Sequence, residues 1–172
     1  MRFYAPAMYR LLSPVAGAFA LLALGSCATP QPWPAQPLAY ANPVLDADFP
    51  DPAVIKAPDG FYYAYATQTE RDGKWINLQV ARSPDLVRWQ HLGDALPAKP
   101  DWASKTQDFW APHVHCDGDT YYMYYSAKPD AALDDQSRGL CLAVATAGRP
   151  EGPFTDIGRP LQCGPAKVWR KA

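Results

Sequence analysis

Residues 42–67 read NPVLDADFPDPAVIKAPDGFYYAYAT, and this stretch decides the fold class. Its middle, Pro58-Asp59-Gly60, is a turn signal, because proline and glycine favour the backbone angles of tight turns. The residues that follow, 61–67, are rich in aromatic side chains, which favour β-strands. A strand on each side of a tight turn predicts a β-hairpin.

The same arrangement recurs further along the chain. From Val44 onward no convincing helical periodicity interrupts the short aromatic or β-branched runs. The chain is therefore predicted to be all-β, and strands at this spacing fit a sandwich, a barrel or a propeller. The later runs are residues 75–81 after Asp72-Gly73-Lys74, residues 113–116 before Asp117-Gly118-Asp119, residues 121–125, and residues 140–147.

The opening stretch chooses among these architectures. Asn42-Pro43-Val44-Leu45, followed by PDPAVI from Pro50, resembles the opening of glycoside hydrolase family 43, which begins the first blade of a five-bladed β-propeller. Without the resemblance, an aspartate before proline would be read as a turn residue. The resemblance instead implies that Asp51 is the general base.

Two further segments resemble the family in the same order along the chain. Residues 83–89 resemble its S-x-D-L-x-x-W element, which other propeller glycosidases share and which we interpret as structural. Phe109-Trp110-Ala111-Pro112-His113 resembles the family's WAP segment beside the sugar pocket. Trp110 is thus a candidate to stack on a sugar ring, with a core aromatic as the alternative. His113 is the second candidate for substrate binding, with a structural histidine as the alternative.

The last match covers residues 139–161, which resemble the family's GPF loop and the strands beside it. Glu151 lies in this loop, but the resemblance implies that it is not the general acid. In the family, the acid and the aspartate that adjusts its pKa come later along the chain. We therefore expect residues 42–172 to be a truncated catalytic domain, roughly the first two to three blades of a partial five-bladed propeller, with poor activity.

The resemblance implies an inverting glycosidase that acts on xylosides or arabinofuranosides of xylan or arabinan and uses no cofactor. Inversion requires one carboxyl group as acid and another as base, about 6.5–9.5 Å apart. We expect no catalytic metal, because His91, His113 and His115 do not have the spacing of a zinc site. The alternative is a non-catalytic glycan-binding lipoprotein. A structural lipoprotein with a generic β-sandwich is disfavoured, because it does not explain the ordered motifs.

The N-terminus predicts an exported lipoprotein. Arg2 and Arg10 precede the apolar residues 11–24, which are too few to span a membrane. Leu24-Gly25-Ser26-Cys27 then resembles a bacterial lipobox, with an ordinary cleavage site as the alternative. We expect residues 1–26 to be a signal peptide, Cys27 to carry lipid, and the proline-rich residues 27–41 to be a tether at the outer membrane or in the periplasm.

Charge and cysteine content add two constraints. Removal of residues 1–26 leaves 14 basic and 17 acidic residues, a net charge near −3 that gives no electrostatic case for binding nucleic acid. If Cys27 carries lipid, three cysteines remain, and an oxidising compartment allows one disulfide among Cys116, Cys141 and Cys163. The sequence leaves the pairing open.

Overall fold

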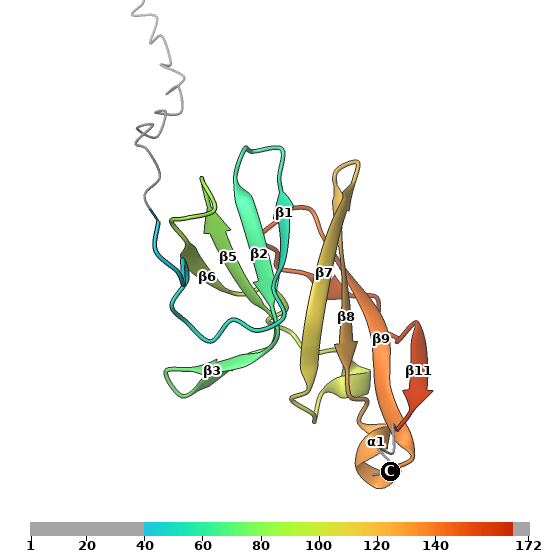
Figure 1. Cartoon of the computed structure of the whole chain (residues 1–172). Coiled ribbons are helices and arrows are strands. Elements are labelled where there is room, and N and C mark those ends of the chain that lie inside the picture. Colours follow the sequence, from blue (N-terminus) through green and yellow to red (C-terminus); the bar gives the residue numbers. More distant parts are fainter. Residues whose placement is uncertain (1–39, 167–172) are drawn as a thin grey trace, which may run out of the picture. The chain divides into compact units, whose positions relative to one another are not determined.

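The computed structural model describes residues 40–166 (Figure 1). The signal peptide, Cys27 and nearly all of the tether lie outside the described residues. The described part is almost entirely β-structure, which confirms the all-β prediction. None of its helices is long and apolar enough to cross a membrane.

The first sheet, blade 1, is a four-stranded antiparallel meander in the order β1-β2-β5-β6. The turn at its tip is stabilised by Asp59, whose Oδ1 accepts a hydrogen bond from the amide of Phe61 at 3.0 Å. Gly60 lies in the turn at φ 86°, which suits glycine. The strands are β1 (Ala53–Lys56), β2 (Tyr62–Ala66), β5 (Gln79–Ser83) and β6 (Gln90–Asp94), with the small hairpin β3 (Thr69–Arg71) and β4 (Lys74–Ile76) between β2 and β5.

The prediction of a single strand over residues 75–81 is wrong. The chain bends at Asn77 and Leu78, where both backbone amides donate to the carboxylate of Asp94, at 2.8 and 3.2 Å. The Asp94 carboxylate thus accepts hydrogen bonds from two amides that would otherwise have continued the strand ladder. The run is divided between the β3–β4 hairpin and β5.

The second sheet, blade 2, repeats the meander in the order β7-β8-β9, and β10 and β11 both pair with the outer edge of β9. Two such sheets confirm a partial propeller, and the described residues form two blades. Residues 162–165, over which the sequence predicts no strand, form β11. The elements are β7 (Phe109–Asp117), β8 (Thr120–Ala127), β9 (Arg138–Ala147), β10 (Thr155–Asp156) and β11 (Gln162–Pro165), with short helices η1 (Asp101–Ala103) and α1 (Ala131–Asp134).

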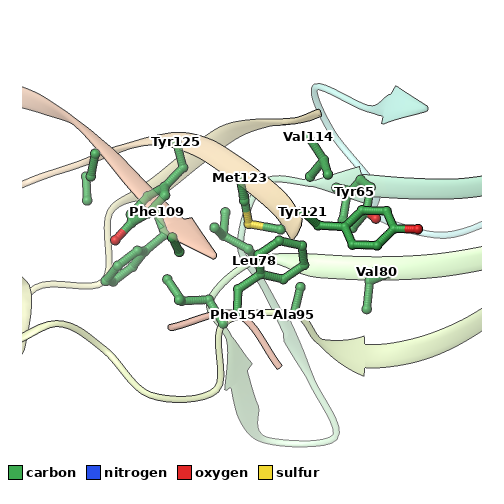
Figure 2. Close-up of a cluster of buried hydrophobic side chains, with 14 of the residues drawn as sticks. Tyr65, Leu78, Val80, Ala95, Phe109, Val114, Tyr121, Met123, Tyr125 and Phe154 are labelled. Carbon is green, nitrogen blue, oxygen red and sulfur yellow. The ribbon is translucent and has the colours of Figure 1, made fainter. Parts of the chain in front are cut away.

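The core fills the space between the two blades (Figure 2). Alternate residues of β2 and β8 belong to this core, as the period of two requires, and Tyr65 of β2 and Met123 of β8 are completely buried. Phe154, from the loop before β10, packs edge-on against Tyr65 at 6.1 Å between ring centroids. Burial of each such side chain contributes about 1.5–3 kcal/mol. The GPF loop is therefore a packing element of the core.

The structure selects the disulfide that the sequence left open. Cys141 of β9 and Cys163 of β11 lie directly opposite each other in the ladder and are bonded. Cys116, at the far end of β7, is outside this bond. The covalent link therefore joins the outer strand of blade 2 to its neighbour.

Candidate functional site

Asp51 lies just before β1, the strand of blade 1 that is adjacent to β7 in Figure 1. Its backbone adopts φ 52°, a left-handed conformation that aspartate tolerates better than most residues. The side chain is exposed, and its Oδ2 accepts a hydrogen bond from the hydroxyl of Thr67 at 2.8 Å. The candidate base is thus a solvent-accessible carboxylate held by a specific donor.

Thr67, at the end of β2, contacts three segments besides the carboxylate. Its amide donates to Pro50 O at 3.1 Å, and its carbonyl accepts from Gln79 Nε2 at 2.8 Å. Its Oγ1 also accepts a hydrogen bond from the amide of Ala111 in β7 at 3.0 Å. Asp51 in blade 1 is therefore connected to blade 2 through a single side chain.

Trp110 and His113 lie on one face of blade 2, directed away from the core. Their partners on β8 are Ser126 and Tyr124, which share a face because they are two residues apart. The register shift between Trp110 and His113 therefore leaves both of these residues on that face. Trp110 is 39% exposed, and His113 is also exposed. Blades 1 and 2 therefore leave the indole of Trp110 partly exposed.

The S-x-D-L-x-x-W element is a self-contained turn. The Asp85 carboxylate accepts hydrogen bonds from the amides of Val87 and Arg88, at 2.9 and 2.8 Å. These bonds, the Arg88 amide first, lower the pKa of Asp85 to about 2. The indole of Trp89 donates to Leu86 O at 3.0 Å. All these interactions are local, which supports the structural interpretation.

Glu151 lies at the opposite end of the blades from Asp51. It is near the β1–β2 turn, where Pro58 and Pro150 line the same hollow, and it pairs with Arg149 at 3.5 Å. An extended chain rises about 3.3 Å per residue, so residues 51–57 span roughly 20 Å. This exceeds the separation of about 6.5–9.5 Å between the carboxyl groups of an inverting glycosidase. Glu151 is thus too far from Asp51 to act as its acid partner.

The described residues also form a hollow of about 370 Å³ on the other face of blade 1. Its lining is mostly apolar and includes Phe49, Val54 and Trp89, whereas Asp51 is not part of it. A pocket that served the proposed base would need its carboxylate. The hollow is therefore not the catalytic site.

Thr67 was not singled out from the sequence, although the register of the β1–β2 hairpin places it opposite Asp51. The hairpin pairs Ala53 with Tyr65, and two further residues outward along each strand place Asp51 opposite Thr67. A threonine opposite a candidate base is a potential donor to its carboxylate. The bond to Ala111 left no such signal, because it joins separate sheets.

Comparisons with known proteins agree with this architecture. The model of "Glycosyl hydrolases family 43" matches residues 40–167, so Gln162–Pro165 lies within the match. The "Probable arabinan endo-1,5-alpha-L-arabinosidase A" of Aspergillus flavus is 32% identical over 69% of this chain and 35% of its own length. The "Xylosidase/arabinosidase 43B" of Humicola insolens is 26% identical over 67% of this chain and 21% of its own length.

A solved structure, described as a thermostable family-43 glycoside hydrolase, superimposes with a TM-score of 0.57 and 34% identity. The superposition covers 72% of this chain and 36% of that one. The chain spans about a third of the length of the A. flavus relative. Because the family model covers nearly the whole described part, the chain belongs to glycoside hydrolase family 43.

Proposed function

We propose that this chain contributes the general base of an inverting glycosidase that acts on arabinan or arabinofuranosides, with xylosides as the second substrate class. The observation that carries the proposal is the exposed Asp51 carboxylate, held by Thr67 at the head of β1. Arabinan is favoured because the A. flavus relative carries that activity in its name. Xylosides remain in the proposal because the H. insolens relative is named for both sugars.

The geometry fits the task of a base. The Thr67 hydroxyl donates to Oδ2 of Asp51. Oδ1 of Asp51 has no hydrogen-bond partner among residues 40–166, so it is free to accept a proton from water. That water would attack the anomeric carbon from the face opposite the leaving group. The proton for the leaving oxygen must come from a carboxyl group other than Glu151, which lies too far away.

The test is hydrolysis of linear arabinan and of the 4-nitrophenyl α-L-arabinofuranoside and β-D-xyloside by the purified protein. Asp51→Asn is the control, because asparagine keeps the shape and tolerates positive φ but cannot act as a base. Activity that the substitution abolishes supports the proposal. Hydrolysis that survives Asp51→Asn contradicts the assignment of Asp51.

Binding without hydrolysis is the second candidate function. The exposed Trp110, with Tyr124 and Leu142 also exposed on the same face of blade 2, favours it. Aromatic rings of this kind stack on the apolar faces of sugars. Calorimetric titration with arabino- and xylo-oligosaccharides separates the two functions. Binding that Trp110→Ala abolishes, in a folded protein without hydrolysis, supports the glycan-binding role.

We also propose that the protein is exported and anchored through a lipid on Cys27, because the lipobox-like Leu24-Gly25-Ser26-Cys27 follows an apolar run. Incorporation of labelled palmitate in bacterial cells tests this proposal. We expect Cys27→Ser to abolish labelling and Cys116→Ser to leave it unchanged. Equal labelling of the two variants contradicts the anchor.

A further inference from the structure

Thr67 is placed to act on the candidate base. Its hydroxyl donates to Asp51 Oδ2, which lies 2.8 Å from Thr67 Oγ1, while Oγ1 also accepts from the Ala111 amide at 3.0 Å. A hydroxyl can donate one hydrogen bond and accept another at once, whereas an apolar side chain of the same shape can do neither. The two bonds together determine the direction in which the hydroxyl donates.

The backbone of Thr67 is held as firmly as its side chain. Its amide donates to Pro50 O and its carbonyl accepts from the fully buried Gln79. Threonine is also β-branched, so that few side-chain rotamers are open to it. The donor of Asp51 therefore has little freedom to turn away.

Both residues that the Thr67 hydroxyl binds have unusual backbones. Asp51 adopts φ 52° and Ala111 adopts φ 48°, a region that residues other than glycine, asparagine and aspartate rarely enter. Such conformations persist where surrounding contacts over-determine them, and they cluster at functional sites. The Thr67 hydroxyl lies between the two.

We propose that Thr67 is a positioning residue that orients the Asp51 carboxylate and fixes its position relative to the first residues of β7. The proposal rests on the proposed role of Asp51 as general base. With Oδ2 engaged by Thr67, Oδ1 is left to meet the water. The bond to Ala111 connects this orientation to β7, the strand that carries Trp110.

The test compares Thr67→Val, which keeps the branched shape and removes the hydroxyl, with Thr67→Ser, which keeps the hydroxyl. Thr69→Val is the matched control, because Thr69 makes the same kind of bond, 2.6 Å to Asp48 Oδ2, two residues along the chain. On arabinan or the arabinofuranoside, we expect Thr67→Val to lower kcat about 10- to 100-fold. KM should change less than about threefold, because the lost interaction serves the chemical step.

Rescue and coupling distinguish positioning from general damage. Thr67→Ser should recover kcat to within about threefold of the unsubstituted protein, and Thr69→Val should have a similarly small effect. In the Asp51→Asn background, Thr67→Val should cause no further loss, because a residue that acts through Asp51 has nothing left to orient. An equal loss in both backgrounds, or no recovery by serine, overturns the proposal.

Nuclear magnetic resonance tests the same contact without turnover. In Thr67→Val we expect the Asp51 carboxyl carbon to change its chemical shift and the Ala111 amide to exchange at least about tenfold faster, since it loses its acceptor. Thr67→Ser and Thr69→Val should leave both signals in place. Unchanged signals in Thr67→Val overturn the proposal even if the protein hydrolyses nothing. Hydrolysis that survives Asp51→Asn refutes the proposed function instead, and the two failures are thus distinguishable.

Discussion

At one end of the two blades, the exposed Asp51 carboxylate is bonded to the Thr67 hydroxyl, whereas at the other end Glu151 pairs with Arg149 beside buried tyrosines. Both acids stand next to a proline-containing turn in sequence. Their surroundings are nevertheless different in kind. The Asp51 end joins the two blades through polar side chains, and the Glu151 end packs aromatic rings under a loop.

A carboxylate in a segment that matches the family is thus not by itself a candidate acid. Glu151 lies in such a segment, but the strands place it at the end of the sheets away from Asp51. At that end, burial and the hydrogen bond to Asp59 raise the pKa of Tyr63 to about 12.

The largest expected contrast is between Asp51→Asn and Glu151→Gln. In an active protein, Asp51→Asn should reduce kcat roughly 10²- to 10⁴-fold, the range for loss of a general base. Glu151→Gln should change kcat by less than about threefold, because Glu151 is remote from Asp51. Rates on the arabinofuranoside, measured with both variants folded to the same extent, check this. A comparable loss in Glu151→Gln would return that residue to the candidate acids.

The disulfide provides a second contrast between the ends. Cys141 pairs in register with Ala127, whose other partner is Phe109, so the bond to Cys163 lies at the Asp51 end of blade 2. With a sequence separation of 22 between the cysteines, Cys163→Ser should lower the free energy of unfolding by about 3 kcal/mol.

Cys116→Ser is the matched control, because Cys116 lies at the Glu151 end and forms no disulfide within residues 40–166. Urea unfolding with and without reductant measures the effect, and hydrogen exchange should show faster opening of β11 than of the β7–β8 turn. A reductant that leaves the unfolding midpoint unchanged would contradict a stabilising role for the bond.

Tyr65→Phe tests how much one buried hydrogen bond to the loop at the Glu151 end contributes to stability. The Tyr65 hydroxyl, which is buried, donates to Pro150 O at 2.6 Å. Its removal leaves that carbonyl without its partner, and we expect a loss of about 1–2 kcal/mol. Tyr124→Phe, at an exposed position of the same residue type, should change stability by less than about 0.5 kcal/mol. Equal losses in thermal melts of the two variants would mean that the Pro150 contact contributes nothing.

The smallest expected effect is at alkaline pH. Tyr63 keeps its proton up to about pH 12 in the folded protein, whereas an unfolded tyrosine loses it near pH 10. Above pH 10 the unfolded chain binds fewer protons, so stability falls as the pH rises through this window. Melting temperatures between pH 8 and 11.5, extrapolated toward pH 12, should fall less steeply for Tyr63→Phe. Parallel curves for the two proteins would contradict a contribution from Tyr63.

Much of the fold was predictable from local patterns. The turn at Pro58-Asp59-Gly60 and the alternation after it led directly to the β1–β2 hairpin. The division of residues 75–81 was not predictable, because the carboxylate that bends the chain at Asn77 belongs to Asp94 on β6. The strand at residues 162–165 was not predicted for a related reason. Its sequence, QCGP, gives little strand signal, and it forms by pairing with β9.

The candidate site was likewise predictable only in part. The family pattern singled out Asp51, Trp110 and His113, and the structure places Asp51 one hydrogen-bonded residue away from the β7 segment. It places Trp110 and His113 at exposed positions of β7, opposite Ser126 and Tyr124 of β8. Their part in sugar binding stays a prediction.

Short contiguous runs of residues were enough to give the strand-and-turn pattern, the family and the candidate base. The folded chain was needed to reveal the Cys141–Cys163 pair, the distance of Glu151 from Asp51 and the bond between Thr67 and Ala111. Each of these joins residues that are distant in the chain. Strand register and the packing of one blade on the next bring them together, and neither is encoded in any single segment.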